Sequence, residues 1–210
     1  MILSNRALLL VGTVTVVANA CGDKSPKSGP AEAQAGAPVV KSAAYGDTAS
    51  ISARADSIDR YVDAHADRLV LFAKVRDRAE LVSVKDTASW PEETTISYNT
   101  IADDSGRPLF HMQAPASESG DWSATEEHYF APDGRTILWR FDLSGFSSGC
   151  TSILREHRAI FLGPTGSVLA ETRRYTDEND KPIAADSCYR RSDSAPAPKR
   201  SAADLPFLRR

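Results

Sequence analysis

The chain has 210 residues, three cysteines and a net charge of −3. Once an export signal, a tether and a tail are set aside, about 140 residues remain, an ordinary size for one globular domain. Arg6 is the only charged residue before Cys21, so removing the signal leaves a net charge of −4. An acidic chain argues against a nucleic-acid-binding protein, because such proteins present a basic patch to the phosphates.

The first twenty residues have the pattern of a secretory signal. Arg6 precedes the apolar run "ALLLVGTVTVVA", and the last residue of this run begins Ala18-Asn19-Ala20, an A-x-A exit. The run is too short to span a bilayer, which takes roughly 20 apolar residues. A short charged start, an apolar middle and small residues at the exit predict a signal peptide over residues 1–20.

Cys21 follows this exit directly, and the arrangement resembles the lipobox of bacterial lipoproteins. In that family the cysteine thiol receives a diacylglycerol, and cleavage leaves the cysteine as the new N-terminus. The resemblance implies a lipid anchor at Cys21 in the bilayer. Because Gly22 rather than Asp comes next, it also implies the outer membrane, facing the periplasm. The alternative is plain secretion with an unpaired Cys21.

Two segments contain few apolar side chains that could form a buried core. Residues 21–50 are rich in small residues, Pro and Gly, which predicts a disordered tether between the anchor and a domain over residues 51–190. The tail, residues 191–210, is predicted to be disordered as well. A sharper alternative makes the tail a short docking segment, and its anchors would be Leu205, Phe207 and Leu208.

The domain is predicted to begin with an amphipathic helix. Apolar residues recur on one helical face at Ile51, Ile58, Val62, Leu69 and Phe72, at spacings of 7, 4, 7 and 3. A hydroxyl side chain, Thr48 or Ser50, is expected to cap the start. The end of the helix is open, because the apolar run 69–75 suits either a helix or a strand.

Four segments of the following region align without gaps: 101–109, 129–137, 161–169 and 175–183. Each begins with an apolar or aromatic residue and has a turn residue five positions later, namely Gly106, Gly134, Gly166 and Asp180. A type I turn followed by a residue with positive φ is the geometry of a bulged hairpin. The sequence therefore predicts a mainly β (α+β) fold, with the helix packed on an antiparallel up-and-down β-meander of about 7–8 strands.

The repeated hairpins resemble the YD-like and MORN-like repeats of bacterial surface proteins. They also resemble uncharacterised lipoproteins in which a helix precedes a β-meander. The candidate strands alternate between apolar and polar residues, so one face of the sheet is expected to be apolar and the other to meet water. The candidate strands are 94–102, 107–113, 122–130, 135–143, 152–162, 167–175 and 182–189.

The remaining cysteines, Cys150 and Cys188, are predicted to pair, because disulfides form in the oxidising compartment that the signal implies. The alternative is two separate buried thiols. Such a bridge would add about 3–4 kcal/mol of stability by closing a loop of this length.

Residues with catalytic or ligand chemistry give no recognised motif. His111, His128 and His157 lie on three predicted strands near Glu126, Glu127 and Glu156, but no metal-binding spacing joins them, and we expect no metal and no cofactor. A nucleophile elbow, a Walker loop and a dinucleotide fingerprint are absent from the sequence. The sequence therefore favours a protein that is not an enzyme.

A speculative anionic-ligand patch is formed by arginines of one predicted hairpin: Arg155, Arg158, Arg173 and Arg174. The alternative is cross-strand ion pairing with Glu156 and Glu171 on a solvated face. The function predicted overall is a membrane-anchored envelope lipoprotein that binds a protein, glycan or lipid through its sheet face. The alternative function is a periplasmic lipid or ligand carrier, or an inhibitor, that uses a cavity between sheet and helix.

Overall fold

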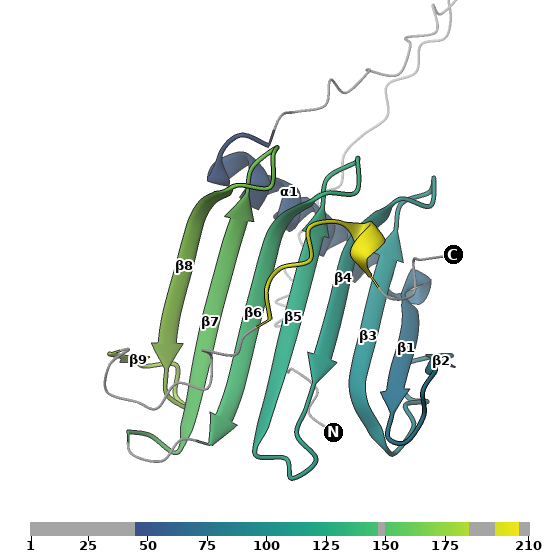
Figure 1. The fold of residues 1–210 in the computed structure, drawn as a ribbon, viewed down its shortest axis with the longest axis vertical. Coiled ribbons are helices and arrows are strands. Elements are labelled where there is room, and N and C mark those ends of the chain that lie inside the picture. The colour runs from purple at the N-terminus through teal and green to yellow at the C-terminus, as the bar shows by residue number, and fades with distance from the viewer. Residues whose placement is uncertain (1–44, 147–149, 185–195, 206–210) are drawn as a thin grey trace, which may run out of the picture. The chain divides into compact units, whose positions relative to one another are not determined.

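The computed structural model describes residues 45–146, 150–184 and 196–205. Over these residues the chain forms one α-helix and one antiparallel sheet of nine strands in the order β2-β1-β3-β4-β5-β6-β7-β8-β9 (Figure 1). From β3 onward each strand pairs with the next along the chain, which makes an up-and-down meander. The predicted fold class is confirmed, and the two strands beyond the seven candidates are β1 and β2.

The elements follow one another in a simple order. They are α1 (Thr48–Ala64), η1 (Ala66–Arg68), β1 (Val70–Val75), β2 (Leu81–Val84), β3 (Thr94–Ala102), β4 (Pro108–Pro115), β5 (Trp122–Phe130), β6 (Thr136–Phe146), β7 (Ile153–Leu162), β8 (Val168–Thr176), β9 (Pro182–Ile183) and η3 (Ala202–Asp204).

Helix α1 is shorter than the longest apolar pattern suggests. It is capped by Asp47, whose carboxylate accepts a 2.8 Å hydrogen bond from the Ser50 backbone N–H, so the expectation of a Thr48 or Ser50 cap is wrong. The helix ends at Ala64, and Phe72 belongs to β1 rather than to the helix. The apolar run 69–75 is therefore mainly strand, which resolves the ambiguity left by its length.

The four aligned turns have the same backbone geometry. Gly106, Gly134 and Gly166 have φ values of 80°, 81° and 76°, and Asp180 has 61°. In each turn the N–H of this residue donates to the carbonyl three positions earlier, at 2.9 to 3.1 Å. Three of the hairpins also carry a register shift just before the turn. This is the bulged hairpin that the alignment predicts, and it fixes the register of the meander.

The helix packs on one face of the sheet, the helix face. Its inward residues are Ile51, Ala55 and Ile58, and all three are fully buried. They join a core cluster with sheet residues Ile101, Leu109, Phe110, Tyr129, Ala131, Ile137 and Leu138. Because the helix lies near one end of the long strands (Figure 1), the rest of the helix face carries other side chains.

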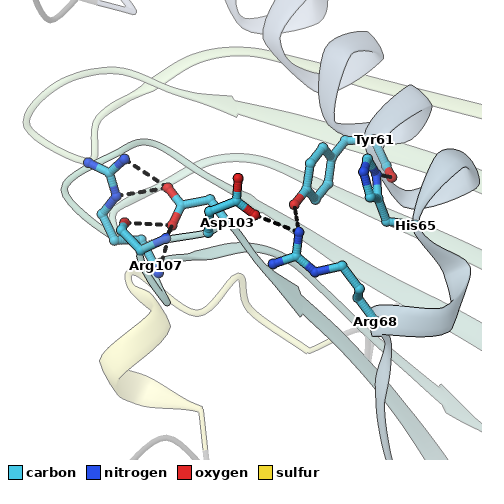
Figure 2. Close-up of polar contacts among 7 residues, drawn as sticks. Tyr61, His65, Arg68, Asp103 and Arg107 are labelled. Atoms are coloured by element: carbon cyan, nitrogen blue, oxygen red, sulfur yellow. Dashed lines mark hydrogen bonds and ion pairs between the residues drawn. The ribbon is translucent and has the colours of Figure 1, made fainter.

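The C-terminal end of the helix is tied to the β3–β4 hairpin. The Arg68 guanidinium donates from Nη1 to Asp104 at 2.6 Å and to the Tyr61 hydroxyl at 2.5 Å (Figure 2). The His65 ring stacks on Tyr61 with centroids 4.1 Å apart. In the hairpin itself, Asp103 accepts from Arg107 and from the backbone, and hydrogen bonds to Ser105 and Arg107 lower the pKa of Asp103 despite its desolvation. These contacts fix where α1 crosses the sheet.

The opposite face of the sheet is covered too, so the expectation of a single apolar face is wrong. Trp139, Phe141, Ala124, Ile160 and Leu162 form a second buried cluster there. Residues 196–205, which we call the strap, cross the sheet on the side away from α1 and pass in front of β5 and β6 (Figure 1). We call this side the strap face.

The strap corrects the predicted disordered tail. Within it, Ala202 and Leu205 are buried against Phe130, and η3 is closed by a capping box between Ser201 and Asp204. The docking alternative for Leu205 is therefore the better description of this segment. The other suggested anchors, Phe207 and Leu208, lie outside the described residues, as do the predicted signal peptide and most of the tether.

Candidate functional site

Polar side chains occupy the part of the helix face that α1 leaves uncovered. In cross-strand register, Glu127 of β5 faces Arg140 of β6, and Asp142 of β6 faces His157 of β7. Arg140 and Asp142 are two residues apart on one strand, so both pairs lie on the same face. Asp59 reaches this group from α1 and contacts Arg140. We call these five residues, Asp59, Glu127, Arg140, Asp142 and His157, the polar floor.

Arg140 connects the helix to the sheet at the centre of the polar floor. Its Nη1 donates to the Tyr129 hydroxyl at 2.7 Å and to Asp59 Oδ2 at 3.3 Å, and it lies 3.9 Å from Glu127 Oε2. The guanidinium carbon also lies 4.8 Å from the centroid of the Tyr129 ring. The Tyr129 hydroxyl in turn is 2.7 Å from Asp59 Oδ1. A cation with this many partners holds its geometry before any ligand arrives.

Burial shifts the pKa of two groups around Arg140. It raises the pKa of the Glu127 carboxyl, and the nearby positive charge of Arg140 opposes that rise. It also raises the pKa of Tyr129 above the ordinary tyrosine value, at which the phenol is already protonated at neutral pH. The network therefore combines a fixed cation, a phenol donor and carboxylate acceptors.

At its outer edge the polar floor is open to solvent. The side chain of Asp142 is 49% exposed and accepts a 2.5 Å hydrogen bond from Nδ1 of His157. The remaining members are between about a quarter and a third exposed. A ligand can thus reach donors and acceptors without any movement of the core, and the arrangement suits recognition by hydrogen bonds and charge.

A second polar group, the buried row, crosses the strap face: Thr100, His111, His128, Glu126 and Trp139. Thr100 Oγ1 lies 3.0 Å from Nδ1 of His111, and the Trp139 indole donates to Glu126 at 2.9 Å. Gln113 also donates to Glu126. His128 and Glu126 lie 3.5 Å apart. Every member is almost inaccessible to solvent.

Burial shifts the pKa of three members of the buried row toward the uncharged form. Desolvation lowers the pKa of His111 to about 4 and that of His128 to about 3, and the neighbouring His111 lowers the second further. Desolvation also raises the pKa of Glu126, although its hydrogen bonds oppose this. Both imidazoles are therefore uncharged at neutral pH and act as hydrogen-bonding groups of the interior.

The three histidines considered as metal ligands do not share one face. His111 and His128 are register partners on the strap face with ring centroids 6.1 Å apart, whereas His157 lies in the polar floor on the helix face. Over residues 45–146, 150–184 and 196–205, no group of three or more His, Cys, Asp or Glu side chains is placed to hold a metal ion.

The structure does not bring the four arginines of the suggested anionic patch together. Arg158 and Arg173 are register partners on the strap face, and each is bound at 2.7 Å by a carboxylate, from Glu171 and Glu156 respectively. Arg155 and Arg174 lie on the other face, where Arg155 pairs with Asp180 at 2.6 Å. The geometry matches the alternative of cross-strand ion pairs.

The cysteines fall mostly outside the described part of the chain. Cys150 is disulfide-bonded. Cys188, its predicted partner, and Cys21, the predicted lipidation site, are both outside the described residues. The pairing and the lipid anchor stay predictions.

The polar floor was not predicted as a site from the sequence. Alternation along β5 does place Glu127 beside Tyr129 on one face, and alternation along β6 places Arg140 beside Asp142. The missing information was the register, which decides that these two pairs are neighbours, and the position of Asp59 over them.

No family model, curated protein or solved structure matches this chain. Among the described helices, none has both the length and the apolar character needed to cross a membrane.

Proposed function

We propose that the protein is an envelope lipoprotein, anchored through acylated Cys21 in the outer membrane and facing the periplasm, which binds a partner through the polar floor. The lipobox-like start and the tether of residues 21–50 support the anchor. The role proposed for the domain is non-enzymatic recognition.

The observation that carries this proposal is how α1 meets the sheet. Its inward side chains are fully buried in one continuous cluster with those of the sheet, so the interface between them is filled by side chains. A carrier needs an apolar cavity of about 300 Å³ or more for an acyl chain. The filled interface favours a surface role over the carrier alternative, and the polar floor is the half-exposed surface beside it.

The chemistry of the polar floor favours a glycan as the partner. Protein interfaces gain most of their affinity from buried aromatic and other large anchors. In the described part of the chain the exposed large apolar residues are Val70, Phe146, Val168 and Leu169, and none belongs to the polar floor. Carboxylates and a guanidinium instead suit the hydroxyl and amide groups of an envelope polysaccharide.

Replacing Cys21 with Ser tests the anchor. We expect the Cys21→Ser protein to move from the membrane fraction to the soluble fraction, because two acyl chains are lost and each buried CH₂ contributes about 0.8 kcal/mol to membrane attachment. Fractionation followed by immunoblotting measures this. An unchanged distribution would contradict the anchor.

The soluble Cys21→Ser protein also tests the polar floor, by co-sedimentation with isolated peptidoglycan sacculi. We expect the wild-type floor to bind and the double variant Asp142→Ala/His157→Ala to bind about tenfold or more weakly, since charge-assisted hydrogen bonds contribute about 1.5–3 kcal/mol each. The matched control is Arg76→Ala/Glu118→Ala, which removes an exposed ion pair elsewhere and should bind normally. Equal loss in both variants, or no binding by the unmodified floor, would contradict glycan recognition here.

A further inference from the structure

The strap is held to the sheet largely by its main chain. Arg200 accepts a 2.9 Å hydrogen bond from the Thr136 N–H, and Ala202 donates at 2.9 Å to the Gly134 carbonyl. Between them, Ser201 forms an antiparallel bridge with Arg135. Thr136 adds a side-chain hydrogen bond, from Oγ1 to the Lys199 carbonyl at 2.6 Å. Main-chain pairing of this kind is available to any extended peptide.

His128 supplies an acceptor for the start of the strap. The Lys199 N–H donates to Nε2 of His128 at 3.0 Å. That bond requires Nε2 to be unprotonated, and the burial of the ring keeps it so at neutral pH. The other ring nitrogen, Nδ1, is buried and has no hydrogen-bond partner among the residues that the structure describes. The imidazole thus makes its hydrogen bond to a main-chain N–H of the strap.

Two small apolar contacts complete the attachment. Leu205 is 1% exposed and, with Ala202, packs against the fully buried Phe130. The strap is shaped for this contact by its own turn, in which the Ser201 N–H donates to Asp204 at 3.0 Å and the Leu205 N–H donates to the Ala202 carbonyl at 3.1 Å. Apart from the main-chain pairing of Arg200 and Ser201, the sheet contacts three strap residues spaced by three: Lys199, Ala202 and Leu205.

We infer that His128, Phe130, Gly134 and Thr136 form a peptide-recognition site, the seat, and that the strap is its intramolecular occupant. The partner that fits the seat is an extended segment of another protein chain. It must offer a main-chain N–H to His128, a small residue three positions later and a leucine six positions later, with an aspartate just before the leucine.

Exchange is favoured because the hydrogen bonds that hold the strap come largely from its main chain and only Ala202 and Leu205 are buried against the sheet. Segments with few buried side chains open at low cost relative to the core. The seat lies on the strap face and the polar floor on the helix face. The two sites share no residue, and the seat goes beyond the function proposed above.

The test uses the full chain, as the Cys21→Ser protein, and a fluorescent peptide with the sequence of residues 196–205, PAPKRSAADL. In the chain variant Leu205→Asp the strap loses its anchor and should leave the seat open. We expect the peptide to bind this variant at least tenfold more tightly than it binds the chain with an intact strap, measured by fluorescence anisotropy.

Variant peptides show whether the seat reads the stated features. Leu205→Asp in the peptide removes the anchor, and Ala202→Pro removes the N–H that Gly134 accepts, so each should weaken binding at least tenfold. Ala203→Ser is the control, because Ala203 is exposed, and it should bind as the unmodified peptide does.

Several outcomes would overturn the inference. They are no binding to a Leu205→Asp chain that circular dichroism shows to be folded, equal binding to the open and closed chains, and equal binding of all four peptides. If Leu205→Asp does not fold, the chain variant Ala202→Pro opens the seat without adding a charge. If neither folds, the strap is an integral part of the core and the seat has no exchangeable occupant.

Discussion

Acidification from pH 7 to pH 4.5 is expected to lower the free energy of unfolding by several kcal/mol through two buried histidines. The pKa of His111 is about 4 and that of His128 about 3 in the folded protein, against 6.5 in an unfolded chain. Below pH 6.5 the unfolded chain therefore binds protons that the folded protein excludes. Stability is full above that pH and is lost as the pH falls, by about 1.4 kcal/mol per pH unit for each histidine.

Glu126 moderates this loss without reversing it. Desolvation raises the pKa of its carboxyl, so the folded state takes up a proton there earlier than the unfolded chain does. Urea denaturation at pH 7, 6, 5 and 4.5 measures the net effect. His128→Asn should reduce the pH dependence of the free energy of unfolding by the contribution of one histidine, about 1.4 kcal/mol per pH unit. The double variant His111→Asn/His128→Asn should nearly abolish this pH dependence between pH 6 and 5. A wild-type stability that is flat from pH 7 to 4.5 would contradict buried neutral imidazoles.

The meander could be predicted because its turns are specified locally. An apolar residue followed five positions later by Gly106, Gly134 or Gly166 is a short-range signal, and the turn that it encodes needs no distant contact to form. Asp180 follows the same pattern because aspartate tolerates a positive φ better than most residues. Four such turns in succession leave little freedom in how the strands between them pair.

The first two strands could not be assigned with the same certainty. The run 69–75 is apolar and short, and periodicity alone does not separate a buried strand from a helix turn at that length. In the fold, β1 lies between β2 and β3, so its pairing depends on neighbours on both sides. Pairing with β2 and β3, rather than the local sequence, determines that this segment is a strand.

The strap differs more from its sequence-based prediction than β1 and β2 do, because composition predicts disorder for a polar, Pro-containing tail. Only a few strap residues are recognised by the sheet, and composition averaged over twenty residues hides them. The burial of Leu205 depends on Phe130, and the capture of Lys199 depends on His128; both partners are some seventy positions away. No local rule connects such residues.

The polar floor and the seat also depend on contacts that local sequence patterns do not reveal. Alternation indicates which residues of one strand share a face, and for β5 it separates Glu127 and Tyr129 from Glu126 and His128. It does not reveal that α1 places Asp59 above one group or that the strap covers the other. Side-chain chemistry could be read from the sequence, whereas the grouping of those side chains required the register.

Replacement of Trp139 by Ala is expected to lower the free energy of unfolding by about 3–5 kcal/mol, the usual cost of removing a large buried aromatic side chain. Trp139 is fully buried, stacks on Phe141 at 5.6 Å and lies under the Arg158 guanidinium. That loss is a large share of the 5–15 kcal/mol, roughly, that stabilises a typical domain. Guanidinium denaturation at pH 7 measures it. The control Phe146→Ala removes an aromatic side chain that is 73% exposed and should change stability by about 0.5 kcal/mol or less.

Trp139→Phe separates packing from hydrogen bonding at the same position. Phenylalanine keeps a ring beside Phe141 but cannot donate to Glu126, which then keeps Gln113 as a donor. We expect a loss of about 1–3 kcal/mol from the weakened satisfaction of a buried carboxyl. In a double-mutant cycle with Glu126→Gln, the coupling between positions 126 and 139 should lie in the range of about 0.5–3 kcal/mol. A coupling near zero would mean that the indole contributes packing alone, and that Glu126 is held in the buried row by its other neighbours.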